Sequence, residues 1–274
     1  MLVAVKTLGQ RRSATNKEQE IARYREIRDG VKSQRGHEFV IHFHDSIATG
    51  EALGDTYLLF QPLARLDFSS LLNSNVALVT LQLVSLLHQV AMGICALHKA
   101  GFIHRDVKPL NLGIRSLEPP SAVVLDLGST VRFPEPGITP SPGTEGTVGY
   151  IAPEMENITR TYGPKVDIWG LGCVGLQVLV ERFRTPALPW CKPLSGQRFN
   201  PWRTPATFTR GHISSEDALY EMRSTHRDVL RSLATSGSET EEILLRMLAE
   251  APHYRPSAES QKQVTLLGRL LSQR

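Results

Sequence analysis

The chain has 274 residues, of which 41% are hydrophobic and 21% are charged, and its formal net charge is +4. That length can bury a full core as one large domain or two lobes, and so mild a basicity does not predict nucleic-acid binding. Three cysteines without metal-binding or redox spacing, no visible signal peptide and no apolar stretch long enough to cross a bilayer predict an intracellular protein, cytoplasmic or nuclear, with no membrane span.

The first sixty residues mix strand and helix patterns. Residues 2–8 predict a buried strand, since β-branched residues suit a pleated surface, yet Lys6 places a charge near its end. Residues 15–31 predict a helix with Asn16 as N-cap, which ends near Gly30. Two strand-like runs follow at residues 38–47 and 55–63. This part of the chain predicts a small mixed lobe.

The remainder of the chain is mainly helical in pattern. Residues 81–101 predict a long helix that ends at a glycine, and further helices are expected around 214–233 and 239–250. Residues 181–212 are rich in Pro, Arg and Trp and predict an irregular insertion. GLGCVG at 170–175 matches a dinucleotide-binding pattern by letter, but it lies in a predicted helix, where small residues favour close packing. A larger helical lobe is expected here.

Six short motifs decide the interpretation. HRDVKPLNL at 104–112 follows the long helix, VVLDLGS at 123–129 ends an apolar strand, and GTVGYIAPE lies at 146–154. With VAVK at 3–6, DIWGLGCV at 167–174 and HYRPSA at 253–258, the sequence resembles the protein kinase family in motif order and spacing over nearly its whole length. The resemblance implies an α+β, two-lobed fold in a single domain, residues 1–274. Its lobes would be an incomplete N-lobe (1–62) and a mostly helical C-lobe (63–274).

The same resemblance implies the catalytic residues. Asp106 would orient the substrate hydroxyl and accept its proton, and Lys108 would reach the transferring phosphate as a point charge. Thr147 would bridge these two side chains. Lys108 in DVKPLN resembles the serine/threonine kinases, so the expected reaction is transfer of the ATP γ-phosphoryl group to Ser or Thr hydroxyls of protein substrates.

The nucleotide site is implied in the same way. Asn111 and Asp126 offer hard oxygen ligands suited to Mg²⁺, and Lys6 would face the α- and β-phosphates of ATP. A helix carboxylate would hold Lys6, with Glu26 as the first choice and Glu20 as the second. The remaining nucleotide contacts are expected around the adenine: Ala4 above it, Phe60 as gatekeeper, and the Gln61 carbonyl and Leu63 N–H at its edge.

Structural and regulatory roles are also implied. Arg255 would form a buried ion pair with Glu154, and Asp167 would brace the backbone of the catalytic loop. Arg105 would contact a phosphorylated residue between Asp126 and Glu154, a charge-assisted interaction that orders a loop. The candidate phosphate acceptors are Thr139, Ser141 and Thr144.

The sequence departs from the family pattern at two places. Only five residues precede Lys6, which leaves no room for the family's Gly-rich loop, and Gly113 offers little surface beneath the adenine. Three hypotheses follow: an active serine/threonine kinase in an incomplete or alternatively started form, a kinase-fold scaffold with weak or no catalysis, and an unrelated helical protein. Intact Lys6, Asp106, Asn111 and Asp126 favour the first hypothesis, whereas the missing Gly-rich loop favours the second for the chain as given.

Overall fold

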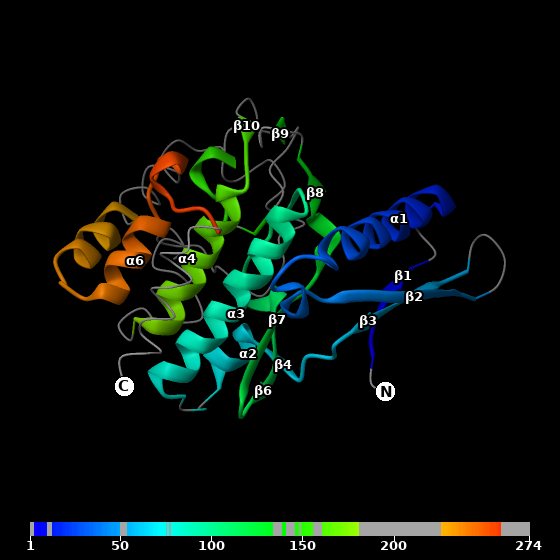
Figure 1. Cartoon of the computed structure of the whole chain (residues 1–274), viewed down its shortest axis with the longest axis horizontal. Helices are drawn as coiled ribbons and strands as arrows, with labels where there is room; N and C mark the ends of the chain where they lie inside the picture. The colour runs from blue at the N-terminus through cyan, green and yellow to red at the C-terminus, as the bar shows by residue number, and fades with distance from the viewer. Residues whose placement is uncertain are drawn as a thin grey trace, which may run out of the picture.

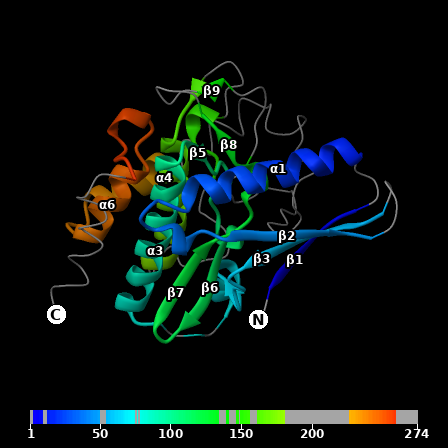
Figure 2. The same cartoon turned by 45° about the vertical axis from the view of Figure 1, so that its right-hand side comes forward.

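The protein has two lobes, a small one built on a sheet and a larger helical one (Figure 1). Figures 1 and 2 agree in placing β1, β2, β3 and α1 at one end of the molecule and α4 and α6 at the other. The α+β, two-lobed fold is therefore confirmed. The computed structural model describes residues 3–9, 13–49, 54–74, 76, 78–133, 139–140, 146–147, 149–155, 161–180 and 226–258.

The small lobe contains an antiparallel sheet in the order β1-β3-β2, formed by β1 (Ala4–Leu8), β2 (His42–Ala48) and β3 (Thr56–Gln61). Because side chains alternate along a strand, Ala4 and Lys6 share one face of β1, opposite Phe60 and Leu58 of β3. A short 3-10 helix, η1 (His37–Phe39), leads into β2. This register fixes the face from which Lys6 projects.

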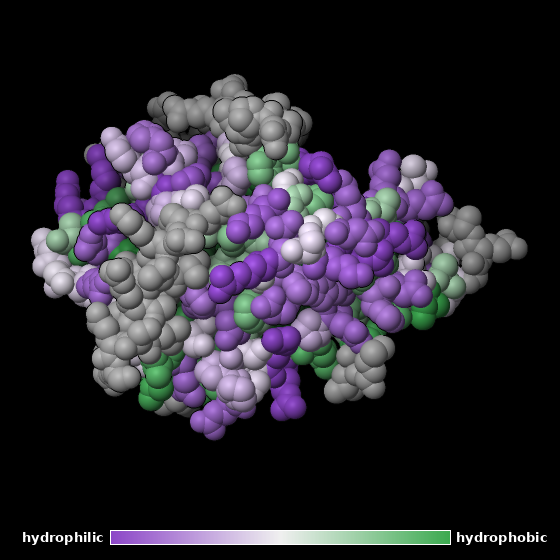
Figure 3. Space-filling model, in the orientation of Figure 1, coloured by the Kyte–Doolittle hydropathy of each residue, from purple (hydrophilic) through white to green (hydrophobic). Residues whose placement is uncertain are grey.

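Helix α1 (Ala14–Val31) covers this sheet and begins earlier than the sequence suggested. Ser13 is its N-cap, and the Ser13 side chain accepts a hydrogen bond from the backbone N–H of Asn16, so the expected Asn16 cap is wrong. Tyr24, Ile27 and Val31 are buried, whereas Figure 3 shows hydrophilic side chains over the outer surface of α1. The helix is thus anchored by one apolar face.

The large lobe combines helices with short strands. Its helices are α2 (Phe68–Asn73), α3 (Thr80–Lys99), α4 (Lys165–Leu179), residues 226–234 and α6 (Glu239–Met247). Within the described part of this lobe, the strands form three small sheets: β4 (Leu66–Asp67) with β6 (Leu112–Leu117) and β7 (Pro120–Val124), β5 (Phe102–Ile103) with β8 (Val131–Arg132), and β9 (Thr139–Pro140) with β10 (Thr161–Tyr162). The 3-10 helices are η2 (Pro109–Asn111), η3 (Leu127–Ser129), η4 (Pro153–Met155) and η7 (Pro252–Tyr254).

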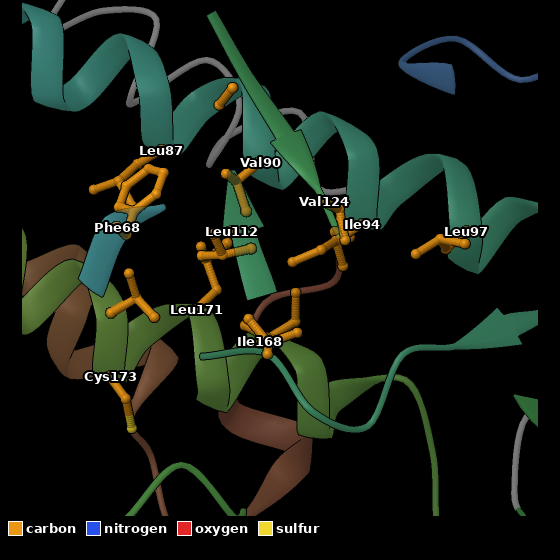
Figure 4. Close-up of a cluster of buried hydrophobic side chains, with 14 of the residues drawn as sticks. Phe68, Leu87, Val90, Ile94, Leu97, Leu112, Val124, Ile168, Leu171 and Cys173 are labelled. Carbon is orange, nitrogen blue, oxygen red and sulfur yellow. The ribbon is translucent and has the colours of Figure 1, made fainter. Parts of the chain in front are cut away.

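The long helix predicted at 81–101 is present as α3, and eleven of its residues are buried. Its side chains pack between the β6–β7 hairpin and α4, and Gly101, with φ of 81°, ends the helix as expected. Within the described residues, α3 is the one helix with the length and apolarity to cross a membrane, and 56% of that stretch is buried inside the protein. Figure 4 shows part of this core: Phe68, Leu87, Val90, Ile94, Leu97, Leu112, Val124, Ile168, Leu171 and Cys173.

The glycines of GLGCVG serve close packing within α4. A Cβ at Gly170 would lie 2.7 Å from the Val107 carbonyl oxygen, and one at Gly175 would lie 2.7 Å from a methyl carbon of Leu244. Both distances are too short for a side chain. The helix-packing interpretation is confirmed, because these glycines let α4 approach the catalytic loop and α6. The expected insertion at 181–212 lies outside the described residues.

His226 gives the large lobe a specific acid sensitivity. Its ring packs 4.7 Å from that of Trp169, and burial, helped by the charge of Arg255, lowers the pKa of His226 to about 4. The unfolded chain takes up this proton near pH 6.5, so stability is expected to fall between pH 6.5 and 4, by at most about 3 kcal/mol. Urea unfolding of wild type and His226→Gln at pH 7, 5.5 and 4 checks this. If the free energy of unfolding fell equally with pH in wild type and in His226→Gln, the assignment of this acid sensitivity to His226 would be wrong.

Candidate active site

Four side chains from two of the motifs lie in contact: Asp106, Lys108 and Asn111 from the catalytic loop (104–112), and Thr147 from the segment 146–154. Lys108 Nζ lies 2.7 Å from Asp106 Oδ2 and 2.6 Å from Thr147 Oγ1, and Thr147 donates to Asp106 Oδ1 at 2.8 Å. Asn111 Nδ2 donates to Asp106 Oδ2 and to the Asp106 carbonyl, both at 2.8 Å. Asp106 is therefore held by three neighbours, with its carboxylate fixed in one orientation.

Asp167, at the start of α4, binds the backbone of this loop. Its carboxylate accepts the backbone N–H groups of His104 at 2.9 Å and Arg105 at 2.8 Å, and it lies 2.7 Å from His98 Nε2. Burial alone would raise the pKa of Asp167, but the His98 contact and these N–H groups hold it below its usual value. Arg105 has φ of 70°, a left-handed conformation that costs free energy in a non-glycine residue. The predicted bracing role of Asp167 agrees with these contacts.

Lys6 connects the small lobe to the D-L-G turn. Its ammonium lies 3.1 Å from Asp126 Oδ1, 3.3 Å from Glu20 Oε1 and 3.1 Å from the hydroxyl oxygen of Tyr24. The expected Lys6–Glu26 pair is wrong. Glu26 is exposed and instead contacts Arg132 at 2.7 Å.

The periodicity of α1 explains this correction. An α-helix turns by about 100° per residue, so Glu20, four positions before Tyr24, lies on the same buried face. Glu26, two positions after Tyr24, lies on the opposite side. Glu20, the second choice, therefore forms the ion pair, and Tyr24 was missed altogether as a polar contact of the lysine.

The charges in this cluster stabilise one another. Burial disfavours the charged form of Lys6, yet Tyr24 and Asp126 raise its pKa above the usual value. For Asp126 burial acts to raise the pKa, but the adjacent Lys6 and the Gly128 N–H hold it below the usual value. Both groups are therefore ionised at neutral pH. Asp126 has φ of 46°, which turns the chain sharply after β7.

Asn111 and Asp126 fit a hard divalent cation such as Mg²⁺ in chemical type. The Nδ2 of Asn111 is used by Asp106, which leaves its amide oxygen as the acceptor. The backbone of the two segments is joined, because Leu125 N–H donates to the Asn111 carbonyl at 2.8 Å. A carboxylate and an amide oxygen on adjoining segments are ligands that Mg²⁺ accepts. This donor set fits the ion that a kinase requires.

Two of the predicted adenine contacts, at Gln61 and Leu63, lie at and just after the end of β3. Phe60 and Gln61 end β3, and Leu63 follows in an exposed position. Gln61, Pro62 and Leu63 line an open cavity of about 420 Å³, together with Arg65 and Arg115. The adenine contacts of Ala4, the Gln61 carbonyl and the Leu63 N–H stay a prediction.

Gly113 lies where neighbouring side chains leave no room for a Cβ atom. A Cβ at this position would lie 2.6 Å from the Ala64 Cβ and 2.9 Å from Leu125 Cδ1, so neighbouring side chains already occupy that space. Gly113 itself is buried. A side chain at this position would therefore collide with Ala64 and Leu125, and the expected loss of surface beneath the adenine stays a prediction.

The predicted ion pair between Glu154 and Arg255 is present and buried. Arg255 Nη1 and Nη2 donate to the two carboxylate oxygens of Glu154 at 2.6 and 2.8 Å. The guanidinium also donates to backbone carbonyls of Ala249 and Glu250, and lies 4.9 Å from the Trp169 ring. This network joins the A-P-E segment to the end of the large lobe.

Arg105 contacts two residues on either side of the segment that holds the candidate phosphate acceptors. Its Nε donates to the Ser129 carbonyl at 2.6 Å, and its Nη1 donates to the Tyr162 hydroxyl at 3.2 Å. The phosphorylation hypothesis stays a prediction, because the side chains of its candidate acceptors lie outside the described residues: Thr139, Ser141 and Thr144.

Comparison with known proteins agrees with this geometry. A family model described as protein kinase domain matches residues 1–267. The chain is 30% identical to cyclin-dependent kinase 7 of Dictyostelium discoideum over 60% of this chain and 43% of that protein. It is 33% identical to mitogen-activated protein kinase mpkC of Emericella nidulans over 58% of this chain and 35% of that protein.

A third relative covers more of the chain. The probable serine/threonine-protein kinase RTK1 of Saccharomyces cerevisiae is 32% identical over 78% of this chain and 32% of that protein. The chain thus spans less than half the length of each of these curated relatives. The family match covers all of the residues that the structure describes. The chain belongs to the protein kinase family.

Proposed function

We propose that this chain transfers the γ-phosphoryl group of ATP to serine or threonine hydroxyls of protein substrates. The observation that carries the proposal is the linked set of Asp106, Lys108, Asn111 and Thr147, in which each polar group has a defined partner. Such a set suits phosphoryl transfer, which depends on positioning and charge stabilisation more than on covalent steps. The curated relatives bear names of serine/threonine, cyclin-dependent and mitogen-activated kinases.

Each residue of the site has a distinct chemical role in this proposal. The Asp106 carboxylate accepts the proton of the substrate hydroxyl, and Lys108, 2.7 Å from it, offers a positive charge to the transferring group. Lys6 extends from β1 toward the phosphates, with Glu20 holding it from α1. Asn111 and Asp126 would hold Mg²⁺, which neutralises phosphate charge when bound.

Nucleotide binding provides a first test. ATP with Mg²⁺ is expected to raise the melting temperature of the wild-type chain by several degrees, since ligand at 100 times its Kd stabilises by about 2.7 kcal/mol. Asp126→Asn should abolish the shift because it removes the carboxylate that would hold the ion. Differential scanning fluorimetry measures both, and Asp45→Asn, at an exposed position of β2, is the matched control.

Two outcomes separate the hypotheses. A shift in wild type and in Asp45→Asn, but not in Asp126→Asn, supports the kinase. No shift in wild type at millimolar ATP and Mg²⁺ contradicts the proposal and favours a scaffold with the kinase fold.

A further inference from the structure

Tyr24 places a phenol at the back of the active site. Its side chain is only 2% exposed, and its ring stacks against Phe43 with centroids 5.9 Å apart and an interplanar angle of 24°. The ring also meets the edge of Phe60, the expected gatekeeper, at 4.9 Å and 70°. Aromatic rings packed in this way hold their position. The hydroxyl at the end of the ring is therefore fixed in space.

That hydroxyl reaches the ammonium of Lys6. The Tyr24 oxygen accepts from Lys6 Nζ at 3.1 Å, while Asp126 Oδ1 lies 3.1 Å and Glu20 Oε1 3.3 Å from the same nitrogen. A lysine ammonium has three N–H donors, so these three oxygens can satisfy all of them. Two of the acceptors are charged, and the third, Tyr24, is neutral. Burial raises the pKa of Tyr24, so the phenol keeps its proton at neutral pH.

The D-L-G turn is built to fit over this contact. A Cβ at Gly128 would lie 3.1 Å from Lys6 Nζ and 3.5 Å from the Tyr24 hydroxyl oxygen, so the bare glycine backbone passes directly beside the pair. The neighbouring residue of α1, Arg23, donates to the Gly128 carbonyl at 3.0 Å. Helix α1 and the turn that carries Asp126 are thus joined at the level of Tyr24.

We propose that Tyr24 is a positioning residue for Lys6, whose hydroxyl directs the ammonium toward the phosphates of a bound nucleotide. This inference rests on the proposed function, because that function supplies the nucleotide. If Asp126 held Mg²⁺, Lys6 would be free to contact a phosphate oxygen instead. Glu20 and Tyr24, both on α1, remain as its protein partners. A neutral, directional acceptor fixes the lysine without adding a negative charge that would repel phosphate.

The test compares a ligand that has phosphates with one that lacks them. In Tyr24→Phe the ring contacts with Phe43 and Phe60 are kept and only the hydroxyl is removed. Because Tyr24 acts through Lys6, affinity for ADP with Mg²⁺ should fall about tenfold, as expected for a lost hydrogen bond to a charged group. Affinity for adenosine, which has no phosphate, should change less than about twofold on the same reasoning. Isothermal titration calorimetry measures both ligands.

Two controls make the result specific. Tyr57→Phe removes a phenol oxygen from β3 on the face of the sheet opposite Lys6, and it should leave both affinities unchanged. In a Lys6→Met background, Tyr24→Phe should have no further effect on ADP binding, because the residue through which it acts is absent.

Each outcome has a defined meaning. A selective loss of ADP affinity that disappears in Lys6→Met supports the positioning role. Equal losses for ADP and adenosine would show that Tyr24 only packs the lobe, and unchanged ADP affinity would show that its hydroxyl is not used; either overturns the inference while the proposed function stands. A wild-type chain that binds neither ligand contradicts the proposed function itself, and the positioning role with it.

Discussion

Replacing Asp106 by asparagine is expected to lower kcat by about 10²–10⁴-fold, the usual contribution of a positioned general base. Asparagine has nearly the same shape as aspartate and can still accept from Thr147 and face Asn111, whose contacts hold Asp106 at 2.8 Å. It cannot accept the proton of the substrate hydroxyl. It also leaves Lys108, now 2.7 Å from a carboxylate, without its charged partner.

The measurement is phosphate transfer from labelled ATP to protein serine or threonine, identified by phosphoamino-acid analysis. Nucleotide affinity should change much less than kcat, because Lys6 and Asp126 lie on other segments and an asparagine side-chain oxygen can still accept from Asn111 Nδ2. Asp228→Asn, at an exposed position of the large lobe, is the matched control and should keep wild-type kcat. An Asp106→Asn variant with kcat close to that of wild type would rule out the proton-accepting role.

The second large effect is on stability. Arg255→Met is expected to lower the free energy of unfolding by about 3–5 kcal/mol, since removing one partner of a buried ion pair leaves the other charge uncompensated. The Arg255 side chain is fully buried and its two Nη atoms are 2.6 and 2.8 Å from the Glu154 carboxylate. Several backbone carbonyls would lose a donor at the same time. The loss should appear as a lower urea midpoint.

A second arginine supplies the control for this experiment. Arg246 pairs with Glu242 on the exposed surface of α6, so Arg246→Met should cost less than about 1 kcal/mol. Adding Glu154→Gln to Arg255→Met should cost less than the sum of the two single changes, because the residual charge is removed. Equal losses for Arg255→Met and Arg246→Met would contradict the structural role of the buried pair.

Much of the fold could be predicted from the sequence because its signals are local. The long apolar run at 81–101 gave α3, the alternating residues near the N-terminus gave β1 to β3, and the glycines of GLGCVG indicated close packing in α4. The catalytic loop was equally readable, since Asp106, Lys108 and Asn111 are neighbours in the chain. Their mutual contacts form within six consecutive residues and so need no contact with a distant segment.

The Asn16 cap is wrong within one short segment, whereas the partner of Lys6 is wrong because that contact joins distant segments. Glu26 was chosen for Lys6 because its surroundings resemble the family's helix, whereas Glu20 lies on the buried face with Tyr24. The repeat of buried positions at 24, 27 and 31 marks the face of α1 that meets the sheet, but it does not say which residue of that face reaches Lys6. At Gly113 no local pattern indicates that Ala64 and Leu125 occupy the space beside the glycine.

The amino-acid sequence by itself determined the family, the two-lobed architecture and the chemical types in the site, because motifs and periodicity are properties of short segments. The tertiary structure alone decided which carboxylate meets Lys6 and placed the Tyr24 hydroxyl beside it. The physical reason is that the rotation and height of α1 on the sheet are set by packing among Tyr24, Phe43 and Phe60, which come from three separate elements. No local pattern contains that arrangement.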